Sequence, residues 1–350
     1  MRQLNWFDLS QYRNKLYGFS ILWIFIFHIS ESFKKQMDFG GLFDVVTFSG
    51  NMGVEIFLFL SGVSLYFSMS KLLKDKKDVN EITMSEIFNF YKRRVRNIII
   101  LYIVFCIPAL YISDIAITGN VELFFHHVFF FNEGCRTYWF LLAIIIFYLI
   151  YPIIFKLIKQ NKKKRIYVFL VVYSIILVYI SYIGLDFYEF YEVMLTRLPI
   201  FVIGSLCGEA VYNKKSVNSY ILIFLFVGAF LRRPILYCFE NISFLKFLYP
   251  IVFRYSLAIP ALCVMFVLCM LFPYFKGKVV DDFLPYIGKM TLEIYVVHIG
   301  LRAIFRSYLR DLNALSKNEV FIFMIILFIL TIFLSIFLNK LLHLRNNRNT

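Results

Sequence analysis

One histidine lies inside a long apolar stretch near the start of the sequence. The stretch runs from Asn14 to Glu31, NKLYGFSILWIFIFHISE, and is long enough to cross a lipid bilayer, with His28 about one turn before its end. An imidazole is costly to bury in hydrocarbon, so a histidine at such a depth is by default a candidate for a functional site. Imidazole titrates near neutral pH, so His28 could take a proton from a reacting hydroxyl as a general base. The plainer alternative is an interior histidine with satisfied hydrogen bonds and no catalytic role.

The other candidate ligands and nucleophiles show no spacing typical of a metal site, so we expect no metal. The six cysteines form no Cys-x-x-Cys pair: Cys106, Cys135, Cys207, Cys238, Cys263 and Cys269. Most of them lie in apolar runs, where a cysteine packs as a small hydrophobic residue. Cys135 and Cys238 fall in loops that we place outside the membrane, which leaves a disulfide between them as an alternative. His126 and His127 have no metal-like partner pattern.

Composition identifies the elements that must position these residues. Hydrophobic residues make up 61% of the 350 and aromatic residues 20%, whereas a water-soluble chain is about half apolar. Each crossing takes about 20 residues, so the length allows about ten helices and no sizeable soluble domain. We therefore predict an all-α, polytopic membrane helix bundle that forms a single integral-membrane domain over residues 1–350. The net charge of +15 does not indicate nucleic acid, because Lys and Arg cluster between the apolar segments.

Ten apolar segments divide the chain. They are predicted at residues 16–36, 50–72, 95–113, 137–157, 166–184, 195–212, 218–236, 249–273, 284–305 and 320–342. Lys and Arg concentrate in the connections after the second and fourth segments, which places both connections in the cytoplasm.

The acidic 114–136 and 185–194 loops then face outward. An even number of spans puts both termini in the cytoplasm, including a short basic tail at 343–350. A helical rise of about 1.5 Å per residue places His28 roughly 20 Å beyond Lys15, toward the outer leaflet.

Six segments carry a resemblance in order and spacing. After the first-helix histidine come GNMGVEIFLFLSGVSLYFS at 50–68, FYKRRVRNIIILY at 90–102, YWFLLAIIIFYLIYP at 138–152, RLPIFVIGSLCGE at 197–209 and LEIYVVHI at 292–299. Together they resemble the acyltransferase-3 family of multi-span membrane O-acyltransferases. The resemblance covers most of the chain. It implies a stand-alone member without a fused soluble esterase-like domain.

The resemblance implies transfer of an acyl group, usually acetyl from acetyl-CoA, to a hydroxyl of an extracytoplasmic polysaccharide or lipid-linked glycan. For that reaction His28 is the candidate general base, and Glu55 could orient its ring through the second nitrogen. The thioester carbonyl becomes an oxyanion and needs hydrogen-bond donors. Polar groups that could converge there are Ser61, Trp139, Arg197 and Tyr295, and His298 is a further candidate for the site.

The phosphates of an acyl-CoA donor need cationic partners, preferably arginines. The candidates at the predicted cytoplasmic side are Arg13, Lys15, Arg93, Arg94 and Arg96. Family members commonly carry Arg or Lys eleven positions before the first-helix histidine, where this chain has Tyr17. Arg13 could substitute for that residue, so the departure bears on the donor side more than on His28.

Each assignment has a structural alternative. The arginines of 93–96 could serve membrane orientation alone, Glu55 could be an interfacial residue at a helix start, and Arg197 and His298 could form structural bonds between helices. At the level of the whole protein, a proton-coupled transporter or flippase would show similar intramembrane charges, and a non-catalytic membrane sensor could keep the fold.

We expect a multi-pass protein of the bacterial plasma membrane that contacts lipids, acyl-CoA and a glycan. The sequence does not specify the acceptor, the length of the acyl group or the oligomeric state.

Overall fold

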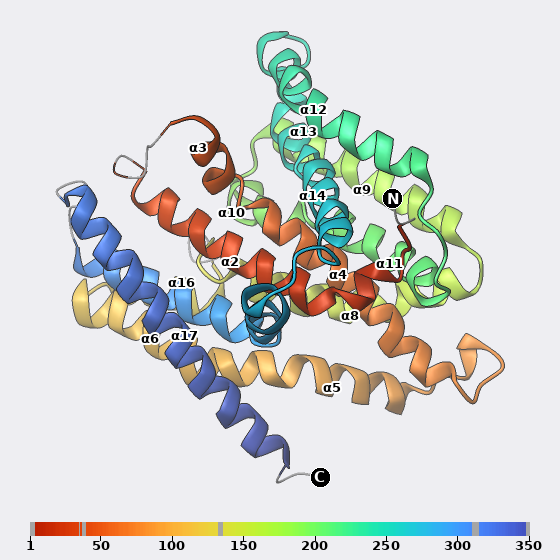
Figure 1. Cartoon of the computed structure of the whole chain (residues 1–350), viewed down its shortest axis with the longest axis horizontal. Coiled ribbons are helices and arrows are strands. Elements are labelled where there is room, and N and C mark those ends of the chain that lie inside the picture. Colours follow the sequence, from red (N-terminus) through yellow and green to blue (C-terminus); the bar gives the residue numbers. More distant parts are fainter. Residues whose placement is uncertain (1–3, 35, 37–39, 132–135, 310–314, 348–350) are drawn as a thin grey trace.

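Helices form every regular element in the part of the chain that the computed structural model describes (Figure 1). That part comprises residues 4–34, 36, 40–131, 136–309 and 315–347. Within it the backbone forms no strand, and an isolated antiparallel bridge pairs Asn5 with Ser216. The predicted all-α class is confirmed.

The first half of the chain holds short helices between long ones. In order they are α1 (Asp8–Gln11), α2 (Arg13–Ser32), α3 (Gly41–Phe48), α4 (Met52–Ser70), η1 (Lys71–Leu73), η2 (Val79–Glu81), α5 (Met84–Leu101), η3 (Tyr102–Cys106), α6 (Ile107–Leu110), η4 (Tyr111–Ile117), α7 (Val121–Phe129) and α8 (Trp139–Lys159). The run from α5 to η4 is one continuous rod along one side of the bundle (Figure 1), and its η3 and η4 segments are π-helical.

The second half continues the bundle. Its helices are α9 (Lys163–Ile183), α10 (Asp186–Leu195), α11 (Leu198–Tyr212), α12 (Ser219–Asn241), η6 (Lys246–Leu248), α13 (Tyr249–Ser256), α14 (Ala258–Leu271), η7 (Val279–Phe283), α15 (Leu284–Gly288), α16 (Thr291–Tyr308) and α17 (Lys317–Asn347). The first residues of the predicted basic tail at 343–350 thus continue α17, and residues 348–350 lie outside the described part.

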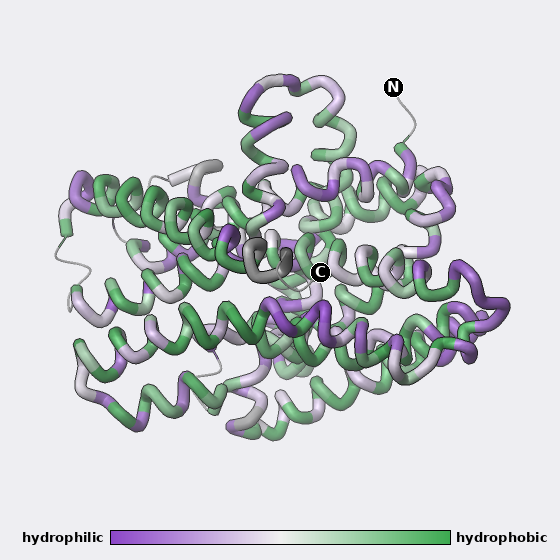
Figure 2. Tube along the Cα trace, turned by 90° about the horizontal axis from the view of Figure 1, so that it is seen from below, coloured by the Kyte–Doolittle hydropathy of each residue, from purple (hydrophilic) through white to green (hydrophobic). Residues whose placement is uncertain are grey.

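Eight helical stretches in the described residues are long and apolar enough to cross a membrane. They are Asp44–Leu73, Met84–Ile117, Trp139–Lys159, Lys163–Ile183, Tyr188–Tyr212, Ser219–Asn241, Lys246–Leu271 and Lys317–Leu342. Apolar residues run along the helices, and hydrophilic residues gather at helix ends and connections (Figure 2). The chain is therefore a multi-pass membrane protein. α2 and α16, two further predicted spans, are not among the eight, so the count of ten and the cytoplasmic termini stay predictions.

One predicted boundary and two predicted loops differ from the structure. The third span was placed at 95–113, but the helix begins at Met84 because Thr83 and Glu86 form a capping box: the Thr83 side chain accepts from the Glu86 amide, and the Glu86 carboxylate accepts from the Thr83 amide. The loops predicted at 114–136 and 185–194 contain helices, α7 and α10. The basic residues of 92–96 therefore lie on a helix rather than in a connection.

The crossing of α4 and α11 brings two of the recognised sequence segments together. At Gly62 of α4, an added Cβ would clash with the carbonyl of Phe201, and at Gly204 of α11 it would clash with the carbonyl of Phe59. Small residues at such a crossing allow two membrane helices to approach closely. This contact fixes α11 against α4, so the start of α11, with Arg197, lies beside Glu55.

Candidate active site

A cavity of about 710 Å³ lies between the helices that carry the predicted site residues. Its walls come from α2, α4, α8, α10, α13 and α16 and from the segment of η4 and α7. The predicted residues that line it are His28, Trp139 and Tyr295. Asp114, His127 and Glu192, from the two predicted outer loops, also face it. The cavity is large enough for a small ligand, and the histidine shares it with both acidic segments.

His28 is held by a cluster of polar side chains that joins α2 to α16. The guanidinium of Arg302 donates to Nδ1 of His28 at 2.8 Å, to the Ser32 hydroxyl at 2.8 Å and to the Glu31 carboxylate at 2.7 Å. The same Glu31 oxygen lies 3.5 Å from Nδ1 of His28. His28, Glu31 and Ser32 follow the spacing i, i+3, i+4, which puts them on one face of α2. Arg302 thus locks the ring orientation of the histidine.

The partners of His28 on α16 lie on a stripe of that helix. Tyr295, His298 and Arg302 are three and four residues apart and share one face. The His298 ring lies 5.4 Å from the His28 ring between centroids, and its Nδ1 donates to the carbonyl of Ile294 at 2.7 Å. His298 is buried and lines a smaller pocket next to the large cavity, with His28 and Arg302.

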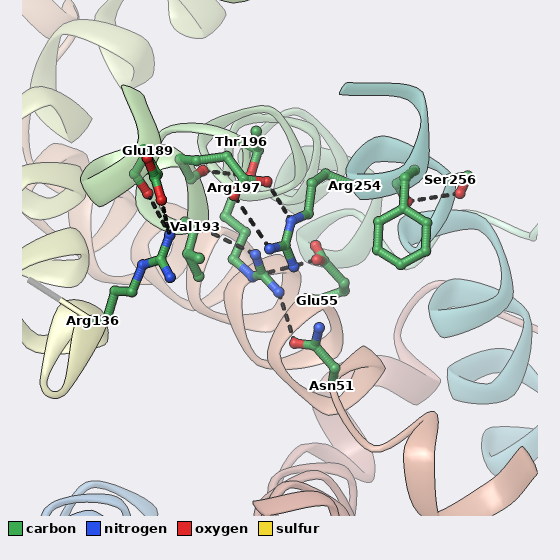
Figure 3. Close-up of polar contacts among 11 residues, drawn as sticks. Asn51, Glu55, Arg136, Glu189, Val193, Thr196, Arg197, Arg254 and Ser256 are labelled. Carbon is green, nitrogen blue, oxygen red and sulfur yellow. Dashed lines mark hydrogen bonds and ion pairs between the residues drawn. The ribbon is translucent and has the colours of Figure 1, made fainter. Parts of the chain in front are cut away.

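A second buried cluster forms the adjoining wall (Figure 3). Arg197, only 1% exposed, places its Nε 3.5 Å from the Glu55 carboxylate, donates to Asn51 Oδ1 at 2.8 Å and to the carbonyl of Val193 at 3.1 Å. Its guanidinium lies 5.0 Å from the centre of the Trp139 ring. Beside it, Arg254 makes a two-pronged pair with Glu192, with distances of 2.6 and 3.3 Å.

The predicted contact between Glu55 and His28 is absent from the structure. The carboxylate of Glu55 pairs with Arg197, whereas the partners of His28 Nδ1 are Arg302 and Glu31. The side chains that contact Nδ1 of His28 therefore come from α2 and α16. The physical reason is the close α4–α11 crossing, which places the buried guanidinium of Arg197 next to Glu55, where each charge needs the other as its counter-charge.

The predicted oxyanion donors separate into two groups. Trp139 and Tyr295 line the cavity with His28. Ser61 does not line it: its hydroxyl donates to the carbonyl of Phe57, one turn earlier in α4, at 2.8 Å. Arg197 lies behind the wall, in contact with Trp139. The structure thus brings two of the four near His28.

The predicted donor-binding residues lie apart from the cavity. Arg93 is exposed on α5, and the guanidinium of Arg94 donates to the hydroxyl of Ser68. Arg96 is half-buried on the same helix, Arg13 is exposed at the start of α2, and Lys15 makes an ion pair with Asp281 at 2.6 Å. Their role in donor binding stays a prediction.

Tyr17, which stands where the family commonly has a basic residue, lies 3.5 Å from the hydroxyl of Ser64. It takes no part in the His28 cluster as the structure describes it.

Sequence reasoning missed the contact of Arg302 with His28 and two further pairs that line the cavity. Arg302 gave a signal, because it is a charged residue in an apolar segment and follows His298 by four positions on the same helix face. Asp114 and His127, which pair at 2.6 Å, gave none: they lie thirteen residues apart on separate helical segments. Glu192 and Arg254 are further apart still in the sequence.

The described residues contain no group of three or more His, Cys, Asp or Glu side chains that could hold a metal ion. Cys238 lies in the last turns of α12 rather than in a loop. The thiol of Cys238 is free in the structure, and Cys135 lies outside the described residues.

The cavity offers groups for proton transfer and for charge stabilisation. Two imidazoles, three carboxylates and four guanidinium groups line it, and the last are those of Arg136, Arg254, Arg302 and Arg306. Such a lining suits a reaction in which a hydroxyl loses a proton and a carbonyl oxygen gains negative charge.

The comparison with family models identifies the chain's family. A family model described as "Acyltransferase domain" matches residues 16–340, from the first turn of α2 to the end of the apolar part of α17. No curated protein and no solved structure matches the chain.

Proposed function

The chain belongs to the acyltransferase-3 family of membrane acyltransferases, and from this premise we propose that it moves an acyl group from acyl-CoA, in the first instance acetyl-CoA, to a hydroxyl of an extracytoplasmic or lipid-linked polysaccharide. In such a transfer the hydroxyl oxygen bonds to the thioester carbonyl carbon, the carbon–sulfur bond breaks and the hydroxyl proton passes to a base. The CoA thiolate leaves.

One observation carries this proposal: His28, fixed by Arg302, Glu31 and Ser32, faces a 710 Å³ cavity. Both predicted outer segments contribute residues to the same cavity. The aromatic rings of Trp139 and Tyr295 in its wall give apolar faces next to hydrogen-bonding groups. These features support a site where a polar acceptor meets the acyl group close to the outer face.

The contact with Arg302 sets a condition for the predicted base. A guanidinium can only donate hydrogen bonds, so Nδ1 of His28 accepts, and a neutral ring then carries its proton on Nε2. To take a proton at Nε2, the ring must hold a proton on Nδ1 and donate it to Glu31, whose carboxylate is 3.5 Å away. The general-base role of His28 stays a prediction, and it requires Arg302 to leave Nδ1.

The basic residues of α5 support a donor site at the other end of the bundle. Arg93, Arg94 and Arg96 lie in the first half of the rod that reaches the cavity through η4. Arginine forks suit phosphate groups. We propose that the nucleotide part of acyl-CoA binds there, with the thioester directed toward His28.

The test uses the whole chain, purified in lipid nanodiscs, with acetyl-CoA labelled in the acetyl group. We expect label to appear in alkali-labile ester on an added polysaccharide, and His28→Ala to abolish it while the variant inserts and accumulates normally. If the wild-type protein neither transfers nor hydrolyses the acetyl group of acetyl-CoA with any acceptor supplied, the proposal is contradicted. That outcome would favour a role in transport or sensing.

A further inference from the structure

A second histidine of the central cavity, His127, is paired with a buried carboxylate. Its Nδ1 lies 2.6 Å from Oδ2 of Asp114, and the hydroxyl of Ser113 donates to the other carboxylate oxygen at 2.7 Å. The side chain of Asp114 is 4% exposed and that of His127 is 14% exposed. Both residues line the cavity that also contains His28. We refer to Asp114 and His127 as the α7 dyad.

The pairing fixes the tautomer of the His127 ring. A carboxylate accepts hydrogen bonds and a hydroxyl already occupies Oδ1, so Nδ1 of His127 holds a proton and donates it to Oδ2. In the neutral ring, Nε2 then carries a lone pair. No described residue hydrogen-bonds to Nε2. A general base needs this arrangement, in which a carboxylate orients one nitrogen and the other is free for the reactant.

Both members of the α7 dyad lie on anchored backbone. The carbonyl of Asp114, in the π-helical η4, accepts from the Asn120 amide at 2.7 Å and from the Thr118 hydroxyl at 2.6 Å. The Tyr102 hydroxyl donates to the carbonyl of Val128, next to His127, at 2.6 Å and so ties α7 to the rod. π-helical turns within helices often mark functional sites. η4 also packs against α16, the helix that carries Arg302.

The neutral rings of the two cavity histidines therefore carry their protons on different nitrogens. His28 accepts at Nδ1 from Arg302 and offers an N–H at Nε2, whereas His127 donates at Nδ1 to Asp114 and offers a lone pair at Nε2. A neutral imidazole N–H can stabilise a developing oxyanion. A lone pair on a carboxylate-held imidazole can accept a proton.

We propose that His127, oriented by Asp114, takes the proton of the acceptor hydroxyl. This inference rests on the proposed function and assigns the base to a residue other than His28. The hydroxyl oxygen bonds to the acyl carbon, its proton passes to Nε2 of His127, and the N–H of His28 donates to the carbonyl oxygen. The carbon–sulfur bond then breaks, and the proton leaves His127 for the medium, where the CoA thiolate is protonated.

The experiment compares four variants in the nanodisc assay: His127→Ala, His127→Asn, Asp114→Asn and the matched control His126→Ala. His126 is on the same helix but does not line the cavity, and its Nε2 lies 4.0 Å from the exposed carboxylate of Glu122. We expect His127→Ala to lower the transfer rate by ~10²–10⁴-fold with little change in KM for acetyl-CoA. His126→Ala should transfer at the wild-type rate.

Added imidazole should restore part of the rate of His127→Ala, because it can enter the space that the ring leaves. Asp114→Asn should lose a comparable factor, since an amide group can donate to Nδ1 and turn the ring to the wrong tautomer. The double variant should be no slower than the slower single one. His127→Asn keeps an N–H for Asp114 and therefore preserves the fold, but it has no base and should also be slow.

Variants of His28 distinguish the two assignments, because under this proposal His28 donates a hydrogen bond and does not take the proton. His28→Gln retains an N–H near the position of Nε2 and should keep part of the rate that His28→Ala loses, whereas a His28 base would be lost equally in both. A folded His127→Asn that transfers within about threefold of wild type would overturn the inference, as would a slow His127→Ala that does not respond to imidazole. Absence of transfer by the wild type would instead contradict the proposed function itself.

Discussion

Arg302 donates an N–H to Nδ1 of His28 across 2.8 Å. The bond joins the first long helix to a helix close to the C-terminal end, and the same guanidinium also holds Ser32 and Glu31. Because Arg302 can only donate hydrogen bonds, Nδ1 of His28 must accept, so Arg302 sets the tautomer of the neutral ring as well as its position. The chemistry available to His28 therefore depends on a residue 274 positions later in the sequence.

We predict that Arg302→Gln lowers the transfer rate by roughly 10²-fold, the order of magnitude for loss of a preorganised donor at a reaction centre. Arg302→Lys should recover little, because an ammonium group cannot reproduce a fork that contacts three partners. The rate is measured with labelled acetyl-CoA at saturating acceptor. Arg233→Gln is the control, since Arg233 is exposed on α12 and does not line the cavity. Equal rates for Arg302→Gln and Arg233→Gln would contradict the prediction.

The basic residues of α5 allow a test of donor binding. Arg93→Gln and Arg94→Gln should each raise KM for acetyl-CoA by about tenfold, equivalent to ~1.4 kcal/mol, and leave kcat unchanged. The reason is that a phosphate contact is made equally in the ground state and the transition state. Arg165→Gln, exposed in the first turn of α9, is the control. If KM stays at the wild-type value in a folded Arg93, Arg94 double variant, these arginines serve orientation alone.

The sequence could predict features that depend on neighbouring residues in the chain, such as apolar helices and helix caps. The apolar runs indicated most of the long helices, and the imidazole of His28 in hydrocarbon indicated a functional cluster. The capping box of Thr83 and Glu86 was also readable, as a Thr-x-x-Glu pattern, and would have extended the third helix to Met84.

The pairings between helices could not be predicted. Glu55 could bond to His28 or to Arg197 on sequence grounds, and the choice depends on the α4–α11 crossing through Gly62 and Gly204. Likewise, Asp114 meets His127 only because η4 and α7 fold back on each other. Spacing along the chain carries no information about such contacts, because each depends on how two separate segments pack.

Membrane orientation can be tested with single cysteines in a cysteine-free background. Asp75→Cys and Lys164→Cys should be protected from an impermeant maleimide in intact cells, whereas Glu122→Cys and Leu185→Cys should be labelled. All four positions are exposed in the structure, and the Lys and Arg excess sets the expected sides. Labelling after membrane disruption confirms that each thiol is accessible. Labelled Asp75→Cys in intact cells would reverse the orientation and move the His28 cavity to the cytoplasmic side.

Lys15 and Asp281 give a prediction about pH. The hydrogen bond from Lys15, followed by that from the Gly277 amide, lowers the pKa of the Asp281 carboxyl below its ordinary value. The folded state thus favours the ionised carboxylate, so the stabilisation is present above the carboxyl's ordinary pKa and is lost as the pH falls through the lowered one. We expect the apparent Tm to fall between about pH 5 and pH 3, and to fall less in Asp281→Asn. Asp282→Asn, the neighbouring carboxyl, should behave as the wild type, and an identical profile for both variants would contradict this.

We expect the buried pair of Glu55 and Arg197 to stabilise the fold, and a double-variant cycle measures how strongly the two residues depend on each other. Both side chains are almost completely buried, at 4% and 1% exposure, and removal of one partner leaves an uncompensated charge. We predict that Glu55→Gln costs about 3–5 kcal/mol, measured by thermal or SDS unfolding in detergent. Arg197→Gln should cost a similar amount, because it leaves the Glu55 carboxylate alone. The double variant should be clearly more stable than the sum of the two losses implies, since it buries two neutral amides that can bond to each other. Additive losses would mean that the two residues act independently, with Arg197 held mainly by Asn51, Val193 and the Trp139 ring.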